Sequence, residues 1–353
     1  MPVKTMPPVA AAAAGAVCIS SSAVLMRLAS TSASITALGR CAFALPVLGA
    51  LALLERRRGV PPMPSRSRWL ARLAGVFLAA DLIVWSHSIA AIGAGLGTVV
   101  GNLEVLIISL LAWLFLGERP HRSLVLASPV MLAGLALVGG LADVGGTRAY
   151  GTDPALGVGY GVGVAILYAV FILMLRQATP SSGAPGARTT VAVAASLFEA
   201  TAGAVAGSVV LGFALHDFRL GPAWPALGWL ALLALTSQVV GWLLITVSMP
   251  RLAAGLIGAL LLIQPAGSVA LSYVVLGERP SALQLLGVAL VLTGVVVAVA
   301  RRAPAAADPR SSRSPESSRY SRYARYWPCS RPSTRIIRHA SGASTGESVS
   351  KSP

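Results

Sequence analysis

The feature that constrains this chain most is a five-residue string that occurs twice. Leu116-Gly117-Glu118-Arg119-Pro120 returns as Leu276-Gly277-Glu278-Arg279-Pro280, 160 positions later. The same offset places Ala94-Gly95-Leu96 over Ala254-Gly255-Leu256. A string that keeps its offset through the apolar segments around it indicates an internal duplication. The chain is therefore expected to contain two copies of one structural unit.

The apolar segments of both copies are long enough to cross a lipid bilayer. The 353 residues are 55% hydrophobic and only 11% charged, whereas soluble proteins carry about 25% charged residues. Ten segments can span a hydrocarbon core of about 30 Å; they are predicted near 8–27, 31–54, 69–90, 95–116, 123–142, 155–175, 189–214, 225–247, 253–276 and 282–300. Because lipid leaves no backbone polar group without a partner, these segments must be helices. The predicted fold class is an all-α integral membrane protein with ten transmembrane helices.

The number of helices in each copy predicts how the copies are related. The first repeat is expected over 8–142 and the second over 155–300, each with five helices. Because five is odd, the second copy must enter the membrane upside down. Inverted repeats of this kind are the architecture of secondary transporters, whose substrate site lies at mid-membrane between the repeats.

Basic residues predict the orientation in the membrane. If the N-terminus is cytoplasmic, the cytoplasmic connections hold twelve basic residues and the opposite side holds four, namely Arg27, Arg148, Arg219 and Arg279. This asymmetry satisfies the positive-inside rule and predicts a multi-pass protein of the cell membrane with both termini in the cytoplasm. The basic tail, 301–353, is expected to be disordered and drawn to anionic lipids rather than to nucleic acid.

The paired Leu-Gly-Glu-Arg-Pro strings resemble a known family. Each closes a helix just before the last helix of its half, and this pattern is similar to the EamA-like branch of the drug/metabolite transporter superfamily. The stretch from Trp85 to Pro120 and the pair Gln264-Pro265 carry the same resemblance. It implies a ten-helix transporter of small metabolites over about residues 10–300, with the third, fourth, eighth and ninth helices around the central site.

Glu104 is the strongest candidate for chemistry within the membrane. An ionisable side chain at this depth costs about 2.5–3.5 kcal/mol on insertion scales, so each one requires a reason. Glu104 lies near the middle of the fourth predicted helix, and the duplication places Gln264 at the equivalent position. Its carboxylate is expected to bind a cation of the substrate or a proton, or else to form a helix–helix contact. Asn102 is two residues away and is a second candidate for the same site.

Arg40 and Asp81 are predicted to form a structural ion pair. They lie at similar depths in two sequential, antiparallel helices, about 20 Å from the same membrane face at 1.5 Å per residue. Pairing is one way to hold two charges within lipid. The alternative is that Arg40 holds a carboxylate of the substrate.

Other polar and aromatic candidates lie in the predicted cavity helices. Trp85 and Trp242 are expected either to stack on a flat or cationic ligand or to pack, and Gln238 is a further binding candidate. Glu199 has no evident partner in the sequence. The motif residues Glu118, Arg119, Glu278 and Arg279 are expected at helix ends, as structural or gating elements rather than as substrate ligands.

These features predict a secondary transporter rather than an enzyme. No nucleotide-binding loop, metalloprotease helix or nucleophile elbow occurs in the sequence, and neither a cofactor nor a metal is expected. The expected partners are the lipid bilayer and a small-molecule substrate, which is expected to be exported in exchange for protons through Glu104. Whether the chain forms a homodimer is left open by the sequence. The alternatives are a lipid-modifying membrane enzyme using Asp81, His87 and Glu104, and a membrane sensor with its output in the tail.

Overall fold

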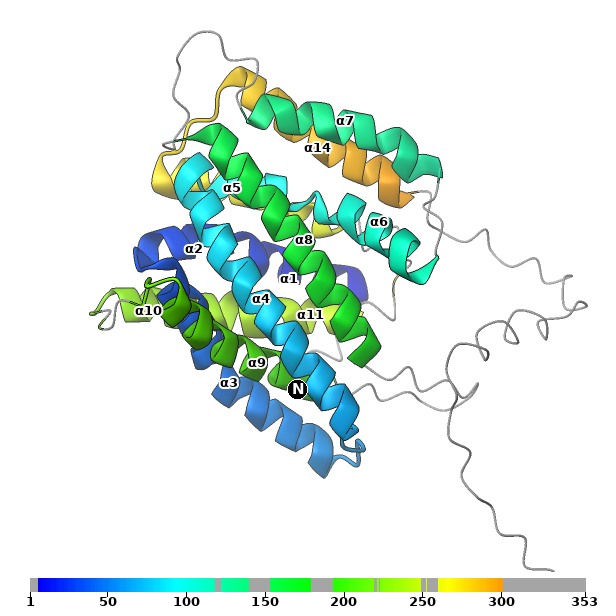
Figure 1. The fold of residues 1–353 in the computed structure, drawn as a ribbon, viewed down its shortest axis with the longest axis vertical. Helices are drawn as coiled ribbons and strands as arrows, with labels where there is room; N and C mark the ends of the chain where they lie inside the picture. Colours follow the sequence, from blue (N-terminus) through cyan, green and yellow to red (C-terminus); the bar gives the residue numbers. More distant parts are fainter. Residues whose placement is uncertain are drawn as a thin grey trace, which may run out of the picture. The chain divides into compact units, whose positions relative to one another are not determined.

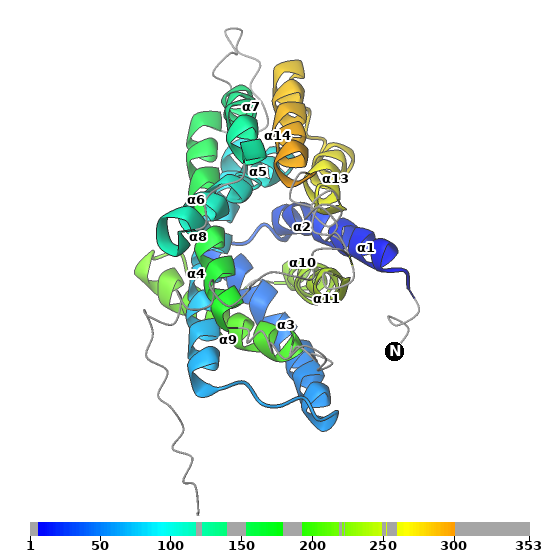
Figure 2. The same ribbon diagram turned by 90° about the vertical axis from the view of Figure 1, so that its right-hand side faces the viewer.

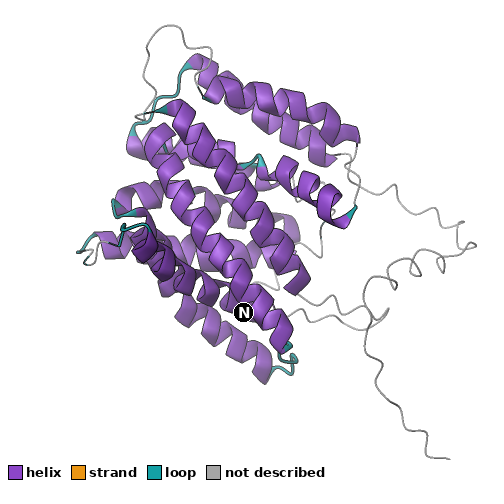
Figure 3. Cartoon of the chain, viewed as in Figure 1, coloured by secondary structure: helices purple, strands orange, loops and turns teal. Residues whose placement is uncertain are grey.

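A computed structural model describes residues 6–117, 122–139, 153–178, 193–218, 221, 223–248, 252 and 260–300. The chain divides into Met1–Ala303 and Pro304–Pro353, and the predicted tail belongs to the part that is not described. Over the described ranges all regular structure is helical (Figure 3). The helices of the first copy are α1 Pro8–Ser20, α2 Ser22–Ala29, α3 Ala33–Arg57, α4 Ser65–Ile92, α5 Ala94–Gly101, α6 Glu104–Leu116 and α7 Arg122–Val138. Those of the second copy are α8 Pro154–Ala178, α9 Val193–Ala214, α10 Ala226–Leu233, η2 Ala234–Gly241, α11 Trp242–Ser248, α13 Ile263–Leu271, η4 Ser272–Leu276 and α14 Ala282–Ala300, where η marks a π-helix.

Seven helical stretches in the described part are long and apolar enough to cross a membrane. They are Pro8–Ala29, Ala33–Arg57, Ser65–Ile92, Ala94–Leu111, Pro154–Leu175, Val193–Ala214 and Ala226–Ser248. Three shorter apolar helices, Arg122–Val138, Ile263–Leu276 and Ala282–Ala298, fall on the other three predicted segments. The all-helical membrane fold is therefore confirmed, while ten spans stays a prediction.

In the described part of the chain, three pairs of equivalent helices lie side by side, namely α3 with α9, α5 with α13 and α7 with α14. The long pairs α3 with α9 and α7 with α14 run in opposite directions (Figures 1 and 2). The Ser34 amide at the start of α3 donates to Asp217 beyond the end of α9, and the Ala194 amide of α9 donates to Glu55 near the end of α3. In the pair α7 and α14, Gln284 Nε2 donates to the Val138 carbonyl. This antiparallel pairing is the arrangement that an inverted repeat requires.

The fourth predicted segment of each copy is a broken helix. The segment predicted at 95–116 is interrupted at Asn102 and Leu103, between α5 and α6. The equivalent segment of the second copy is interrupted at Leu262, directly before α13. Interrupted helices at equivalent positions of inverted repeats are typical of transporters and lie next to the transported solute.

Glycines allow helices of the two copies to approach closely. A Cβ atom on Gly134 of α7 would lie 2.7 Å from the Gly287 carbonyl of α14, and one on Gly75 of α4 would collide with the Ala200 carbonyl of α9. Small residues at such crossings are the usual basis of helix packing in lipid. The largest cluster of buried apolar side chains joins α2, α3, α4, α8, α9 and α10, and it surrounds the residues described next.

Candidate functional site

Four ionisable side chains from four helices lie close enough for their charges to interact. They are Arg40 of α3, Asp81 of α4, Glu104 of α6 and Tyr168 of α8, hereafter the central cluster. Arg40 and Asp81 are only 5% and 4% exposed. The first three belong to the first copy and Tyr168 belongs to the second. The central cluster therefore lies where the two copies meet.

The guanidinium of Arg40 joins the two copies by hydrogen bonds. Its Nε donates to Gln238 Oε1 over 3.0 Å and its Nη1 donates to Ser22 Oγ over 2.9 Å. Gln238 is 3% exposed and lies in the π-helical stretch η2, a geometry often found at functional sites. Gln238, predicted as a binding residue, is thus a partner of Arg40.

The predicted ion pair between Arg40 and Asp81 is corrected by this geometry. No nitrogen of Arg40 lies within 4.0 Å of an Asp81 oxygen, although the two charges still interact through space. The physical reason is that Ser22 and Gln238 present acceptors directly to the guanidinium. Arg40 is therefore held by neutral groups, and its positive charge is not matched by a direct contact.

Asp81 is left with an open acceptor. Its Oδ1 atom is buried and has no hydrogen-bond partner. Burying such an atom is costly, because the lost interaction with water is not replaced. The buried carboxylate therefore has one position at which a proton or a ligand can be accepted.

Glu104 begins α6, immediately after the break in the fourth helix. The break leaves it among the helix-terminal amides, where a carboxylate is favoured. Asn102 turns back on its own helix and donates from Nδ2 to the Thr98 carbonyl over 2.9 Å. Gln264 occupies the equivalent start of α13, and no hydrogen bond joins it to Glu104. The structure thus places Glu104 with Asp81, and it places Asn102 in the helix break itself.

Aromatic rings line the second-copy side of the central cluster. The ring centroid of Tyr168 lies 5.7 Å from that of Phe171 and 6.5 Å from that of Trp242. Phe171 meets Trp242 edge to face at 6.5 Å. Trp85, by contrast, packs in the buried core around α4. Trp242 therefore lies against the ring of Tyr168, and both tryptophans pack against the largest apolar cluster.

Glu278 holds the beginning of α5, a helix of the other copy. Its Oε1 accepts from the Ala94 amide over 2.7 Å and its Oε2 accepts from the Gly95 amide over 3.2 Å. Its neighbour Arg279 is exposed. The equivalent motif residues of the first copy, Glu118 and Arg119, lie outside the described residues.

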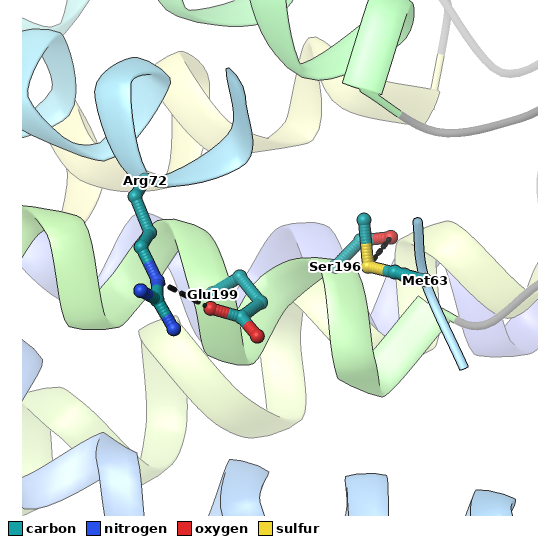
Figure 4. A network of polar contacts seen from close by, with 4 residues as sticks. All are labelled: Met63, Arg72, Ser196 and Glu199. Atoms are coloured by element: carbon teal, nitrogen blue, oxygen red, sulfur yellow. Dashed lines mark hydrogen bonds and ion pairs between the residues drawn. The ribbon is translucent and has the colours of Figure 1, made fainter. Parts of the chain in front are cut away.

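Glu199 and His87 have local partners away from the central cluster. Glu199 of α9 accepts from Arg72 of α4 in an ion pair of 2.7 Å, close to the contact between Ser196 and Met63 (Figure 4). The exposed ring of His87 lies 5.5 Å from the ring of Tyr160. Within the described residues, no three His, Cys, Asp or Glu side chains are grouped as a metal site would need.

Sequence reasoning missed three members of the site, namely Ser22, Tyr168 and Phe171. Tyr168 and Phe171 lie in an apolar segment whose aromatic residues carry no signal of their own. The only sequence pattern that could have indicated them is their spacing of three residues, which places Tyr168 and Phe171 on one face of α8. The other members were found because polar side chains are rare in such segments.

The sequence and the fold of this chain are similar to those of known proteins. The model of the EamA-like transporter family matches residues 6–140 and 155–300. No characterised protein sequence matches significantly. Among 24 similar chains of known structure, one described as "Crystal structure of protein" superposes with a TM-score of 0.54. At 18% identity over 84% of this chain and 98% of that one, it is similar in fold.

Proposed function

The chain belongs to the EamA-like transporter family, and we propose that this membrane transporter exchanges a small organic cation for a proton at the central cluster. The two copies would alternate between two arrangements, each opening the cluster to one side of the membrane. The observation that carries the proposal is the buried, unpartnered Oδ1 of Asp81 beside Glu104, at the junction of both copies.

The charges of the cluster favour a positively charged solute. The cluster contains two carboxylates, those of Asp81 and Glu104, and one guanidinium, whose Nε and Nη1 are already engaged by Gln238 and Ser22. With both acids ionised, the sum is one negative charge. An uncompensated charge within the membrane is expensive, so a cation or a proton must supply the balance. Because both would use the same carboxylates, binding of one displaces the other.

The aromatic rings favour a solute with an apolar or flat body. Tyr168 of α8 belongs to the central cluster, and the ring of Trp242 from α11 lies against it; both helices belong to the second copy. The face of an aromatic ring attracts an organic cation, with about 2 kcal/mol or more available when water is excluded. Trp242 thus acts as a wall of the site, and Gln238 and Arg40 fix its geometry.

The proposed exchange predicts export of the cation. A proton that enters from outside would cancel the single net negative charge of the cluster and release the cation on that side. With the predicted orientation, the inward proton gradient of a cell membrane then drives the cation outward. Neither ATP nor a cofactor is required by this scheme.

No observation favours the alternative enzyme. A lipid-modifying centre would need Asp81, His87 and Glu104 to converge. Asp81 and His87 are six residues apart on α4, so their side chains point about 120° apart around the helix. His87 is exposed and lies against Tyr160, whereas Asp81 is buried within the cluster.

Flux into proteoliposomes that enclose a pH-sensitive dye tests the proposal. Benzyltrimethylammonium, an aromatic ion with fixed positive charge, is compared with benzoate and benzyl alcohol. We expect the cation to be transported with release of protons, and we expect Asp81→Asn and Glu104→Gln to abolish the exchange. Glu199→Gln, which removes a carboxylate outside the cluster, should retain it. Transport of benzoate in place of the cation would contradict the charge argument. Absence of transport for all three solutes would contradict the cation exchange as a whole.

A further inference from the structure

Carboxylates of one copy cap helices of the other copy at three places. Glu55 accepts from the Ala194 and Ala195 amides of α9 over 3.0 and 3.1 Å, and Asp217 accepts from the Ser34 amide of α3 over 3.0 Å. Glu278 accepts from two amides of α5. The first amides of a helix have no partner within the helix and carry its positive dipole end, so a carboxylate satisfies both. Each cap exists only while the two copies stay together at that point.

Two helix pairs are held at both ends and can act as a frame. Glu55 and Asp217 join opposite ends of α3 and α9. In α7 and α14, Gln284 donates to the Val138 carbonyl at one end and Ser123 donates to the Ala298 carbonyl at the other. Neither pair contributes a broken helix. Of the three equivalent pairs that pack on each other in the described part, the remaining pair consists of the broken helices around α5 and α13, and a path between the copies can open there.

Glu278 closes one end of this remaining pair. Its side chain is 5% exposed and reaches from the loop after η4 to the start of α5. One turn further, Thr98 Oγ1 and Ser268 Oγ share a hydrogen bond of 3.0 Å between α5 and α13. Both contacts lie on the side of the membrane predicted to be external. While they hold, α5 and α13 cannot separate there.

Gly93 makes room for the Glu278 carboxylate. Its φ of +93° is a conformation that residues with side chains rarely adopt, and a Cβ atom at this position would lie 2.9 Å from Oε2 of Glu278. Glycine is therefore required for two independent reasons, the backbone angle and the space. The carboxylate and the glycine form one built contact rather than a chance approach of two chains.

We propose that Glu278, received by Gly93 and the start of α5, is a latch that keeps the external side of the transporter closed. The proposal rests on the alternating exchange proposed above and adds the contact that must break in each cycle. Release of the carboxylate frees the α5 amides and lets the outer ends of the two broken helices part. The two frame pairs keep their hydrogen bonds throughout this movement.

Thiol accessibility tests the latch directly. Cys18, Cys41 and Cys329 are first replaced, and Thr98→Cys places one thiol beneath the latch. A membrane-impermeant maleimide is added to the external face of right-side-out vesicles. We expect Glu278→Gln and Gly93→Ala each to raise the labelling rate at least tenfold. Glu278→Gln removes the charge from the hydrogen bonds to the α5 amides, and Gly93→Ala fills the space that the Glu278 carboxylate occupies. A tenfold shift corresponds to about 1.4 kcal/mol.

Two matched variants separate the latch from a general loss of structure. Glu55→Gln removes another two-amide cap, and Glu118→Gln changes the equivalent carboxylate of the first motif, which lies outside the described residues. Neither should raise external labelling of the thiol. Equal increases in all four variants, or none with Glu278→Gln and Gly93→Ala, would overturn the proposal. Because the readout needs no substrate, a latch without cation exchange would refute only the proposed function, and cation exchange with unchanged labelling would refute only the latch.

Discussion

The hydrogen bond between Arg40 and Gln238 should be a measurable link between the two copies. It is 3.0 Å long, and its side chains are 5% and 3% exposed. Hydrogen bonds between neutral groups of membrane helices contribute about 0.6 kcal/mol on average and about 1.7 kcal/mol at most. Bonds to a charged group contribute about 1.5–3 kcal/mol in proteins generally. The overlap of the two ranges predicts a coupling energy of about 1.5–1.7 kcal/mol.

A double-mutant cycle measures this coupling. Arg40→Met, Gln238→Leu and the double variant are unfolded by SDS in mixed micelles, and their free energies of unfolding are compared with that of the parent. Each single variant should be destabilised, because the partner left behind is buried without its hydrogen bond. The double variant should be less destabilised than the sum of the two singles.

The ion pair between Arg72 and Glu199 supplies the control cycle. It is shorter, at 2.7 Å, but the Arg72 side chain is 44% exposed. Exposed ion pairs contribute about 0–1 kcal/mol, so this coupling should be the smaller of the two despite the shorter distance. A coupling below about 0.5 kcal/mol for Arg40 and Gln238 would refute the argument that burial of the guanidinium makes this contact the stronger link.

Four further substitutions test the packing of the copies. Gly75→Leu should abolish folding, since its side chain would collide with the α9 backbone, whereas Gly159→Leu, where nothing lies within 4 Å of a Cβ, should fold like the parent; monodispersity in detergent distinguishes them. Ser268→Ala should cost about 0.6 kcal/mol in SDS unfolding by removing the bond to Thr98. Gln284→Ala should cost about 1–3 kcal/mol in the same assay, because the side chain is 1% exposed and donates to Val138; an unchanged midpoint would refute that role.

The duplication predicted the relative direction of equivalent helices better than it predicted contacts between side chains. Its offset of 160 residues implied antiparallel equivalents, and α3 with α9 and α7 with α14 run in this way. The breaks at Asn102 and Leu262 were not predicted, because an apolar segment has the same composition whether it is continuous or interrupted. The membrane fold followed from composition alone, since lipid permits so few alternatives.

Side-chain partners depend on rotation about the helix axis, which the sequence does not supply. The rise of 1.5 Å per residue placed Arg40 and Asp81 at one depth, but Arg40 bonds to Gln238 from the other copy. Similarly, Glu199 had no visible partner because Arg72 lies on a helix distant in sequence. Depth follows from residue number, whereas the direction of a side chain follows from the packing of several helices at once.

Access to the central cluster from both sides of the membrane tests the account most directly. In a chain without its native cysteines, Ser22→Cys places a thiol beside the guanidinium of Arg40. Impermeant methanethiosulfonate reagents are applied to one face of sealed vesicles at a time, with and without benzyltrimethylammonium. We predict modification from either face and protection by the cation. Modification from one face only, under every solute condition, would contradict alternating access at this site.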